Sequence, residues 1–279
     1  MQKDLRKNIM SKYSKKIIAG GCSFTDKRQP LTLGYKHNTW PEFVGELLGM
    51  EVINLGQCGS GNRQIKYRVF NEIMKYDPKD IGYVFVGWTE WTRLDYETST
   101  RYTPMQMEET GIYNGDYYWT YGPGVGRNQI PTSRFKEMIN VKTNDPSQDF
   151  LRYPIFEHLA KQSLQYYYDI QNLCKDLNIP YYCFQAIATL PCLEFEEEWR
   201  YMRETSSKLL MEEKISALID EKCFWGWPIE KFIGGNTMVE WCKKKNGVQS
   251  WFNIKGNDRH PSEKSHRLWA EQWCEYVNS

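Results

Sequence analysis

The first 90 residues alternate between short apolar runs and amphipathic stretches. The apolar runs cover residues 16–20, 51–55 and 81–87, a length typical of buried strands. Between them, residues 40–48 and 65–74 repeat apolar side chains at the spacing of one helix face. Because a parallel strand pair needs a crossover, which a helix usually supplies, this alternation predicts an α/β fold with a central parallel sheet and covering helices.

The rest of the chain extends the pattern less regularly. Its spacing predicts a helix, a fourth strand, a charged helical stretch, a short helix and a last helix, over residues 156–177, 179–185, 193–219, 238–244 and 261–277. Outside the short helix, residues 223–256 carry no clear pattern. No clear linker divides the chain, so we expect one domain over residues 1–279.

One segment interrupts the alternation. Residues from about 95 to 149 are rich in Tyr, Thr, Gly and Asn and lack a helical period. Within them, Ile112–Trp119 contains an Asn-Gly pair between aromatic residues, which predicts a β-hairpin. We interpret the segment as an irregular, aromatic-rich insertion that leaves the sheet.

The charge balance excludes two classes of partner. The chain has 36 basic and 35 acidic residues and a formal net charge of +1. Neither nucleic acid nor an anionic membrane surface is therefore expected as a bulk electrostatic partner. No apolar run approaches the roughly 20 residues of a membrane span, and residues 1–16 are polar and basic. We therefore expect a cytoplasmic location.

Cysteine and aromatic residues are both numerous. The eight cysteines form no C-x-x-C pair, so we expect reduced thiols and no zinc site or other metal. The 11 Trp, 19 Tyr and 12 Phe fit either a core of large side chains or flat platforms for sugar rings. Composition alone does not choose between these two interpretations.

Reactive residues follow the predicted strands, where ligands bind in open parallel sheets. Ser23 follows the first strand, Gly59 lies in the glycine-rich turn after the second, and Thr89 follows the third. A fourth piece, Asp258 with His260, precedes the last helix. Serine, histidine and carboxylate at one sheet edge predict a nucleophile, its base and the group that orients the base.

Four short blocks of the chain resemble those of the SGNH, or GDSL-type, hydrolase superfamily, namely Gly21–Thr25, Asn54–Gly59, Gly87–Glu90 and Asp258–Pro261. The likeness covers most of the chain in outline and implies a flavodoxin-like three-layer sandwich that needs no cofactor. The family usually has Asp at the positions of Cys22 and Glu90 and Asn at the position of Thr89. The variation over 88–93 also resembles a divergent branch found in tailed phages.

The resemblance implies a role for each residue. Ser23 Oγ attacks an ester carbonyl, His260 takes its proton and returns it to the leaving alcohol, and Asp258 orients the imidazole. The N–H groups of Ser23 and Gly59, with the Thr89 hydroxyl, face the developing oxyanion.

A threonine hydroxyl reaches less far than an asparagine amide, so either it suffices, another group substitutes for it, or the oxyanion site is weak. Asn62 and Arg93 are candidates to replace the missing donor. A structural ion pair explains Arg93 equally well. His266 is expected to be a packed helix residue.

Three functions stay open on these residues. The first is a serine esterase or deacetylase that acts on a small-molecule or glycan ester, including acetyl groups on carbohydrate. The second is a non-catalytic structural or binding module on the same fold, since a fold does not determine a function. A phage virion component is one example, and its partners would be copies of itself or other proteins of the virion. The third is an acyltransferase with the same triad.

Overall fold

A five-stranded parallel sheet forms the centre of the computed structural model, which describes residues 15–97 except 33, 35 and 92, together with residues 118–121, 152–189, 196–247 and 260–278. The strands lie in the order β2-β1-β3-β6-β7, all parallel, with bounds Glu51–Asn54, Lys16–Gly20, Ile81–Trp88, Tyr181–Gln185 and Phe224–Trp225. Counted along the chain, this is the flavodoxin-like order 2-1-3-4-5. The predicted α/β class and parallel sheet are confirmed.

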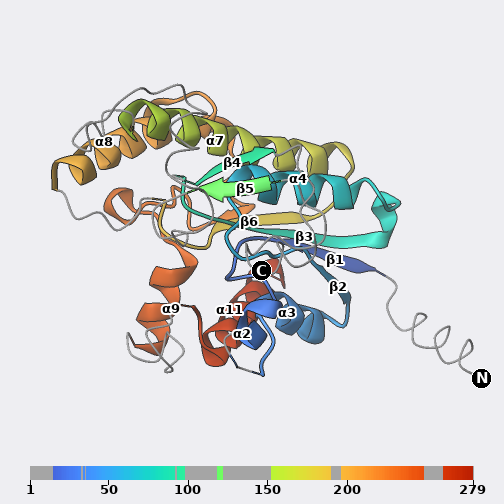
Figure 1. Cartoon of the computed structure of the whole chain (residues 1–279). Helices are drawn as coiled ribbons and strands as arrows, with labels where there is room; N and C mark the ends of the chain where they lie inside the picture. Colours follow the sequence, from blue (N-terminus) through green and yellow to red (C-terminus); the bar gives the residue numbers. More distant parts are fainter. Residues whose placement is uncertain are drawn as a thin grey trace, which may run out of the picture.

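Helices cover both faces of this sheet, which makes three layers (Figure 1). On one face lie α4, α7 and α8, with bounds Asn62–Ile73, Arg152–Asp176 and Glu196–Glu212. On the other lie α2, α3, α9 and α11, with bounds Arg28–Thr32, Trp40–Leu48, Met238–Asn246 and Glu263–Asn278. Short 3₁₀ turns η1, η3 and η4 cover Pro78–Asp80, Ser216–Leu218 and Lys231–Ile233. None of the described helices combines the length and apolarity needed to cross a membrane.

Local chemistry explains where the helices begin and end. Thr39 and Glu42 form a capping box at the start of α3, and Gly49 closes that helix with a φ of 64°. The helix predicted over 193–219 instead ends at Glu212, because the chain turns back and the Ser216 hydroxyl donates to the Leu209 carbonyl at 2.6 Å. Residues 190–195 lie outside the described part of the chain.

Large aromatic rings fill the space between the sheet and the α3–α11 layer. Trp40 packs edge-on against Phe85 and Phe184, with ring centroids 6.1 and 5.3 Å apart. Trp269 and Trp273 of α11 are buried against the same rings. The core interpretation of the aromatic content is therefore confirmed for these residues, and each ring adds apolar burial and edge-to-face attraction.

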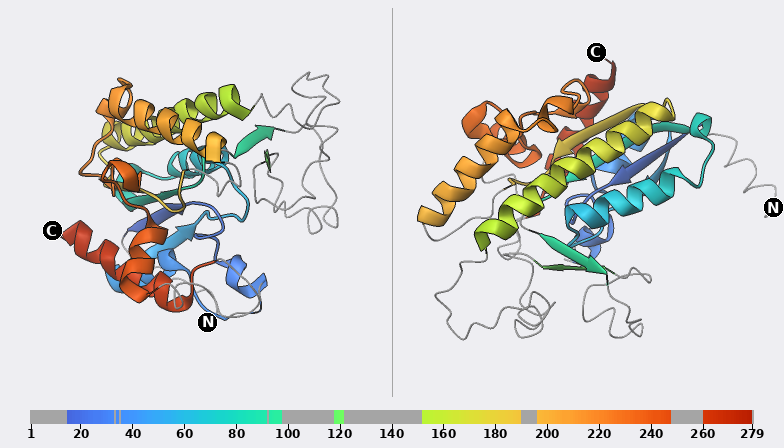
Figure 2. Two further views of the ribbon diagram at one scale, coloured as in Figure 1. Left: turned by 90° about the vertical axis from the view of Figure 1, so that its left-hand side faces the viewer. Right: turned by 90° about the horizontal axis from the view of Figure 1, so that it is seen from above.

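The interrupting segment begins as a second, smaller sheet. Strand β4, Leu94–Glu97, pairs antiparallel with β5, Tyr118–Tyr121. Figure 2 shows this ladder beside the main sheet. The hairpin predicted at 112–119 lies outside the described residues except for its last two, which belong to β5.

Candidate active site

The nucleophile candidate stands in a tight turn directly after β1. Ser23 is 7% exposed, and the Thr25 and Asp26 amides both donate to the Cys22 carbonyl, at 2.9 and 3.1 Å. Neighbouring elements hold the same turn, because Asn54 Nδ2 donates to the Thr25 carbonyl at 2.8 Å. Ser23 therefore lies at the carboxyl end of its strand, as its sequence position predicts.

The histidine candidate lies beside this turn. His260 comes three residues before α11, and its ring meets the ring of Phe24 edge-on, with centroids 5.6 Å apart. Phe24 is the neighbour of Ser23 in the chain, so His260 lies beside the turn that carries Ser23. Asp258, the predicted orienting carboxylate, lies outside the described residues.

The glycine-rich loop after β2 leaves one of its amides without an acceptor. The amides of residues 56, 57, 58, 60 and 61 donate to acceptors at 2.8–3.2 Å. Within the described part of the chain, the Gly59 amide alone among residues 56–61 has no acceptor. Gly59 has a φ of 81°, a conformation that favours glycine. The loop therefore holds the amides around Gly59 while the Gly59 N–H has no acceptor among the described residues.

The third block is anchored through its backbone and not through its hydroxyl. Asn62 Oδ1 accepts from the Thr89 amide at 2.9 Å, and Gln185 Nε2 donates to the Thr89 carbonyl at 2.7 Å. The Thr89 side chain is fully buried, and its Oγ1 has no hydrogen-bond partner among the described residues. A buried hydroxyl without a partner costs stability.

The two substitute donors proposed from the sequence are already engaged. Asn62 begins α4, and its Nδ2 donates to the Thr89 carbonyl at 3.2 Å and to Ser163 Oγ at 3.0 Å. Arg93 pairs with Glu90 at 3.1 Å and donates from Nη1 to the Ser60 carbonyl at 3.1 Å. Both side chains are therefore held by contacts within the protein.

Two further carboxylates, which the sequence did not single out, hold the glycine-rich loop. Asp26 is 2% exposed and accepts from the Cys58 amide at 3.0 Å. Asp95 is 4% exposed and accepts from the Gly61 amide at 3.0 Å. Neither belongs to a recognisable motif, and the only signal was that each closely follows a predicted strand-end residue.

Another buried carboxyl joins the loops that follow β6 and β7. The Thr189 hydroxyl donates to the Glu230 carboxyl, and the Trp91 amide donates to the Thr189 carbonyl at 3.0 Å. Burial, aided by the nearby Glu240 charge, raises the pKa of Glu230 to about 8. No group of three His, Cys, Asp or Glu within the described ranges is arranged to hold a metal ion.

His266 is a packed helix residue, as its spacing predicts. It is 2% exposed and its Nδ1 accepts from the Trp40 amide at 3.3 Å, which ties α11 to α3. Burial, with smaller contributions from His37 and His260, holds the pKa of His266 well below 6.5. The imidazole therefore stays neutral in the native protein.

This neutral histidine makes stability depend on pH. Below pH 6.5 the unfolded chain binds a proton that the native state excludes, so the free energy of unfolding is expected to fall by about 1.4 kcal/mol per pH unit. In His266→Asn the side-chain amide oxygen takes the place of Nδ1 as acceptor, and position 266 no longer carries a group that titrates. From pH 7.5 to 5.5, the free energy of unfolding measured with urea should fall by about 1.4 kcal/mol less in the variant than in the wild-type protein. Equal slopes would contradict the neutral assignment.

Fold and candidate site together define an α/β protein with a serine turn and a glycine-rich loop at the carboxyl edge of a parallel sheet, and with a histidine beside the serine turn. No family model matches the chain, and no curated protein matches it either.

Several solved structures are similar to it. A G-D-S-L family protein from Desulfitobacterium hafniense is 13% identical with a TM-score of 0.40, over 94% of this chain and 99% of that one. An acetylxylan esterase from Geobacillus stearothermophilus is 12% identical with a TM-score of 0.44, over 96% and 95%. The esterase EstA from Pseudoalteromonas is 10% identical with a TM-score of 0.41, over 95% and 97%. At identities this low, the function of this chain has to be argued from its own residues.

Proposed function

We propose that this protein is a serine ester hydrolase that removes short acyl groups, with acetyl esters of carbohydrate as the first substrate class to test. The observation that carries the proposal is the meeting of the Ser23 turn with His260, whose ring touches Phe24 at a centroid distance of 5.6 Å. A nucleophile and its base must lie within hydrogen-bond reach in the reacting complex.

The proposed chemistry gives each of these groups one role. Ser23 Oγ attacks the ester carbonyl while His260 takes its proton. The oxyanion that forms is stabilised by the amides of Ser23 and Gly59 and by the Thr89 hydroxyl. His260 then protonates the departing alcohol, and water releases the acyl group by the same steps. Asp258, two residues before His260, is proposed to orient the imidazole.

Labelling by a fluorophosphonate probe tests the proposal, because the probe reacts with activated serines. We expect wild-type protein to hydrolyse p-nitrophenyl acetate and to carry the label on the peptide that contains Ser23. Ser23→Ala should lose the label. Ser207→Ala is the matched control, since that hydroxyl lies on α8 and donates to the Arg203 carbonyl at 3.0 Å. It should keep both turnover and label.

Two results separate this proposal from its alternatives. Wild-type protein with neither turnover nor label would favour a non-catalytic binding module on the same fold. Transfer of the acyl group to an added sugar, in preference to water, would favour an acyltransferase with the same residues.

A further inference from the structure

We propose that Asp26 and Asp95 are positioning residues that hold the Gly59 amide in place for the oxyanion. This inference rests on the proposed esterase function, and it concerns two buried carboxylates that lie outside the proposed triad and oxyanion donors. They reach the glycine-rich loop from two different elements and bind it on either side of Gly59.

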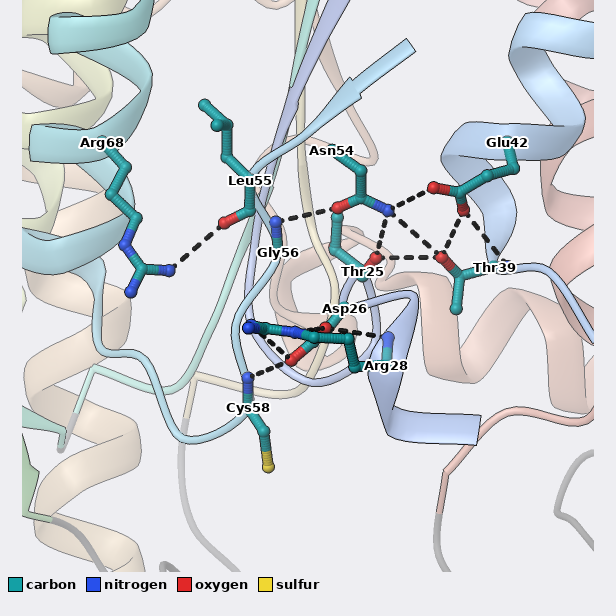
Figure 3. A network of polar contacts seen from close by, with 10 residues as sticks. All are labelled: Thr25, Asp26, Arg28, Thr39, Glu42, Asn54, Leu55, Gly56, Cys58 and Arg68. Carbon is teal, nitrogen blue, oxygen red and sulfur yellow. Dashed lines mark hydrogen bonds and ion pairs between the residues drawn. The ribbon is translucent and has the colours of Figure 1, made fainter. Parts of the chain in front are cut away.

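Asp26 joins the nucleophile turn to the oxyanion loop (Figure 3). Its own amide donates to the Cys22 carbonyl, so the residue belongs to the Ser23 turn. Its Oδ2 accepts from the Cys58 amide, and Arg28 neutralises the charge through its Nε at 2.9 Å. The residue directly before Gly59 is thereby fixed to the turn that carries Ser23.

Asp95 holds the other side of the loop from strand β4. Its two oxygens accept from the amides of Gly61 and Gln64, at 3.0 and 2.9 Å. These amides belong to the start of α4, where the helix dipole favours a negative charge. A Cβ on Gly61 would lie 2.5–2.7 Å from the Asp95 carboxylate, so the residue at 61 must be glycine for this contact to form.

Together the two carboxylates fix the loop and leave its central amide open. Cys58 and Gly61 flank Gly59 in the chain, and each donates to a buried carboxylate that belongs to another element. Burying a charge is costly unless hydrogen bonds satisfy it, and both carboxylates are satisfied by loop amides. A preorganised donor stabilises an oxyanion without moving during the reaction, which is the advantage this arrangement supplies.

Conservative variants test the inference. In Asp26→Asn and Asp95→Asn the side-chain amide keeps the shape and retains a single acceptor oxygen, so the loop amides lose a partner. We expect kcat on p-nitrophenyl acetate to fall at least about tenfold with KM within about twofold, because a misplaced donor weakens only the transition state. The rate of fluorophosphonate labelling should fall in parallel.

Gly61→Ala gives the same test without changing charge. Its φ of −91° suits alanine, so the expected loss of kcat comes from displacing Asp95 alone. The matched control is Asp220→Asn, since Asp220 likewise accepts from a backbone amide, that of Lys222 at 3.2 Å. Asp220 precedes β7 and so lies at the amino ends of the parallel strands, opposite the edge that carries the proposed site. That variant should lose stability and keep kcat.

The outcomes distinguish this inference from the function on which it rests. If wild-type protein turns over ester while folded Asp26→Asn, Asp95→Asn and Gly61→Ala keep kcat within about twofold, the positioning role is wrong and the esterase stands. If wild-type protein shows neither turnover nor label, the proposed function is overturned and this inference falls with it. Gly61→Ala decides the point if an Asn variant does not fold.

Discussion

Removing the Ser23 hydroxyl or the His260 imidazole is expected to lower kcat at least about 10⁴-fold, and removing both should lower it little further. The two groups act as one unit, since the serine is a weak nucleophile until the imidazole takes its proton. Effects of such a unit do not add. The measurement is kcat on p-nitrophenyl acetate for Ser23→Ala, His260→Ala and the double variant.

A matched control separates catalysis from folding in this series. His158 is exposed on α7 and is not among the proposed site residues, so His158→Ala should keep wild-type kcat. If the losses of Ser23→Ala and His260→Ala multiply in the double variant, the two residues act independently. If His260→Ala alone keeps its activity, another group is the base.

Thr89→Val is expected to lower kcat by about 10²–10³-fold while making the protein more stable. The hydroxyl is proposed to contact the oxyanion, and losing one such donor has an effect of about that size. In the free protein Oγ1 is buried and has no partner among the described residues. Valine removes that unpaired group at nearly the same volume, so the free energy of unfolding should rise by about 1 kcal/mol.

A lower kcat together with a higher free energy of unfolding distinguishes a catalytic role of Thr89 from a structural one. A merely structural threonine would change stability without changing kcat. Thr205→Val on α8 is the control for the exchange itself and should leave kcat unchanged. Kinetics on p-nitrophenyl acetate and urea unfolding of the same preparations check both effects. Unchanged kcat in Thr89→Val would mean that the two backbone amides suffice.

Much of the fold was predictable because its elements are long and periodic. Four of the five parallel strands and the helices from α3 to α11 follow from apolar spacing, and α11 begins within two residues of its expected start. Strand β7 was missed because Phe224 and Trp225 alone are too short to show an alternation. The β4–β5 ladder was missed because its two strands lie in a segment without a clear period.

Some residues of the candidate site were likewise predictable from the sequence, and others were not. Ser23 and Gly59 were recognisable because each directly follows an apolar strand, and His260 because it precedes a helix. The engagement of Asn62 and Arg93 was not predictable, since Asn62 donates to Ser163 of α7, which is 101 residues away in the chain. Asp26 and Asp95 likewise bind amides 32 and 34 residues away.

The sequence by itself determined the elements and the residue types that stand at their ends, because apolar period, caps and turns depend on neighbours in the chain. Only the tertiary structure decided which polar groups at the sheet edge are bound and which stay free. Strand order sets the distances between loops, and those distances determine that the Asn62 amide is engaged while the Gly59 N–H and the Thr89 hydroxyl have no acceptor within the described residues.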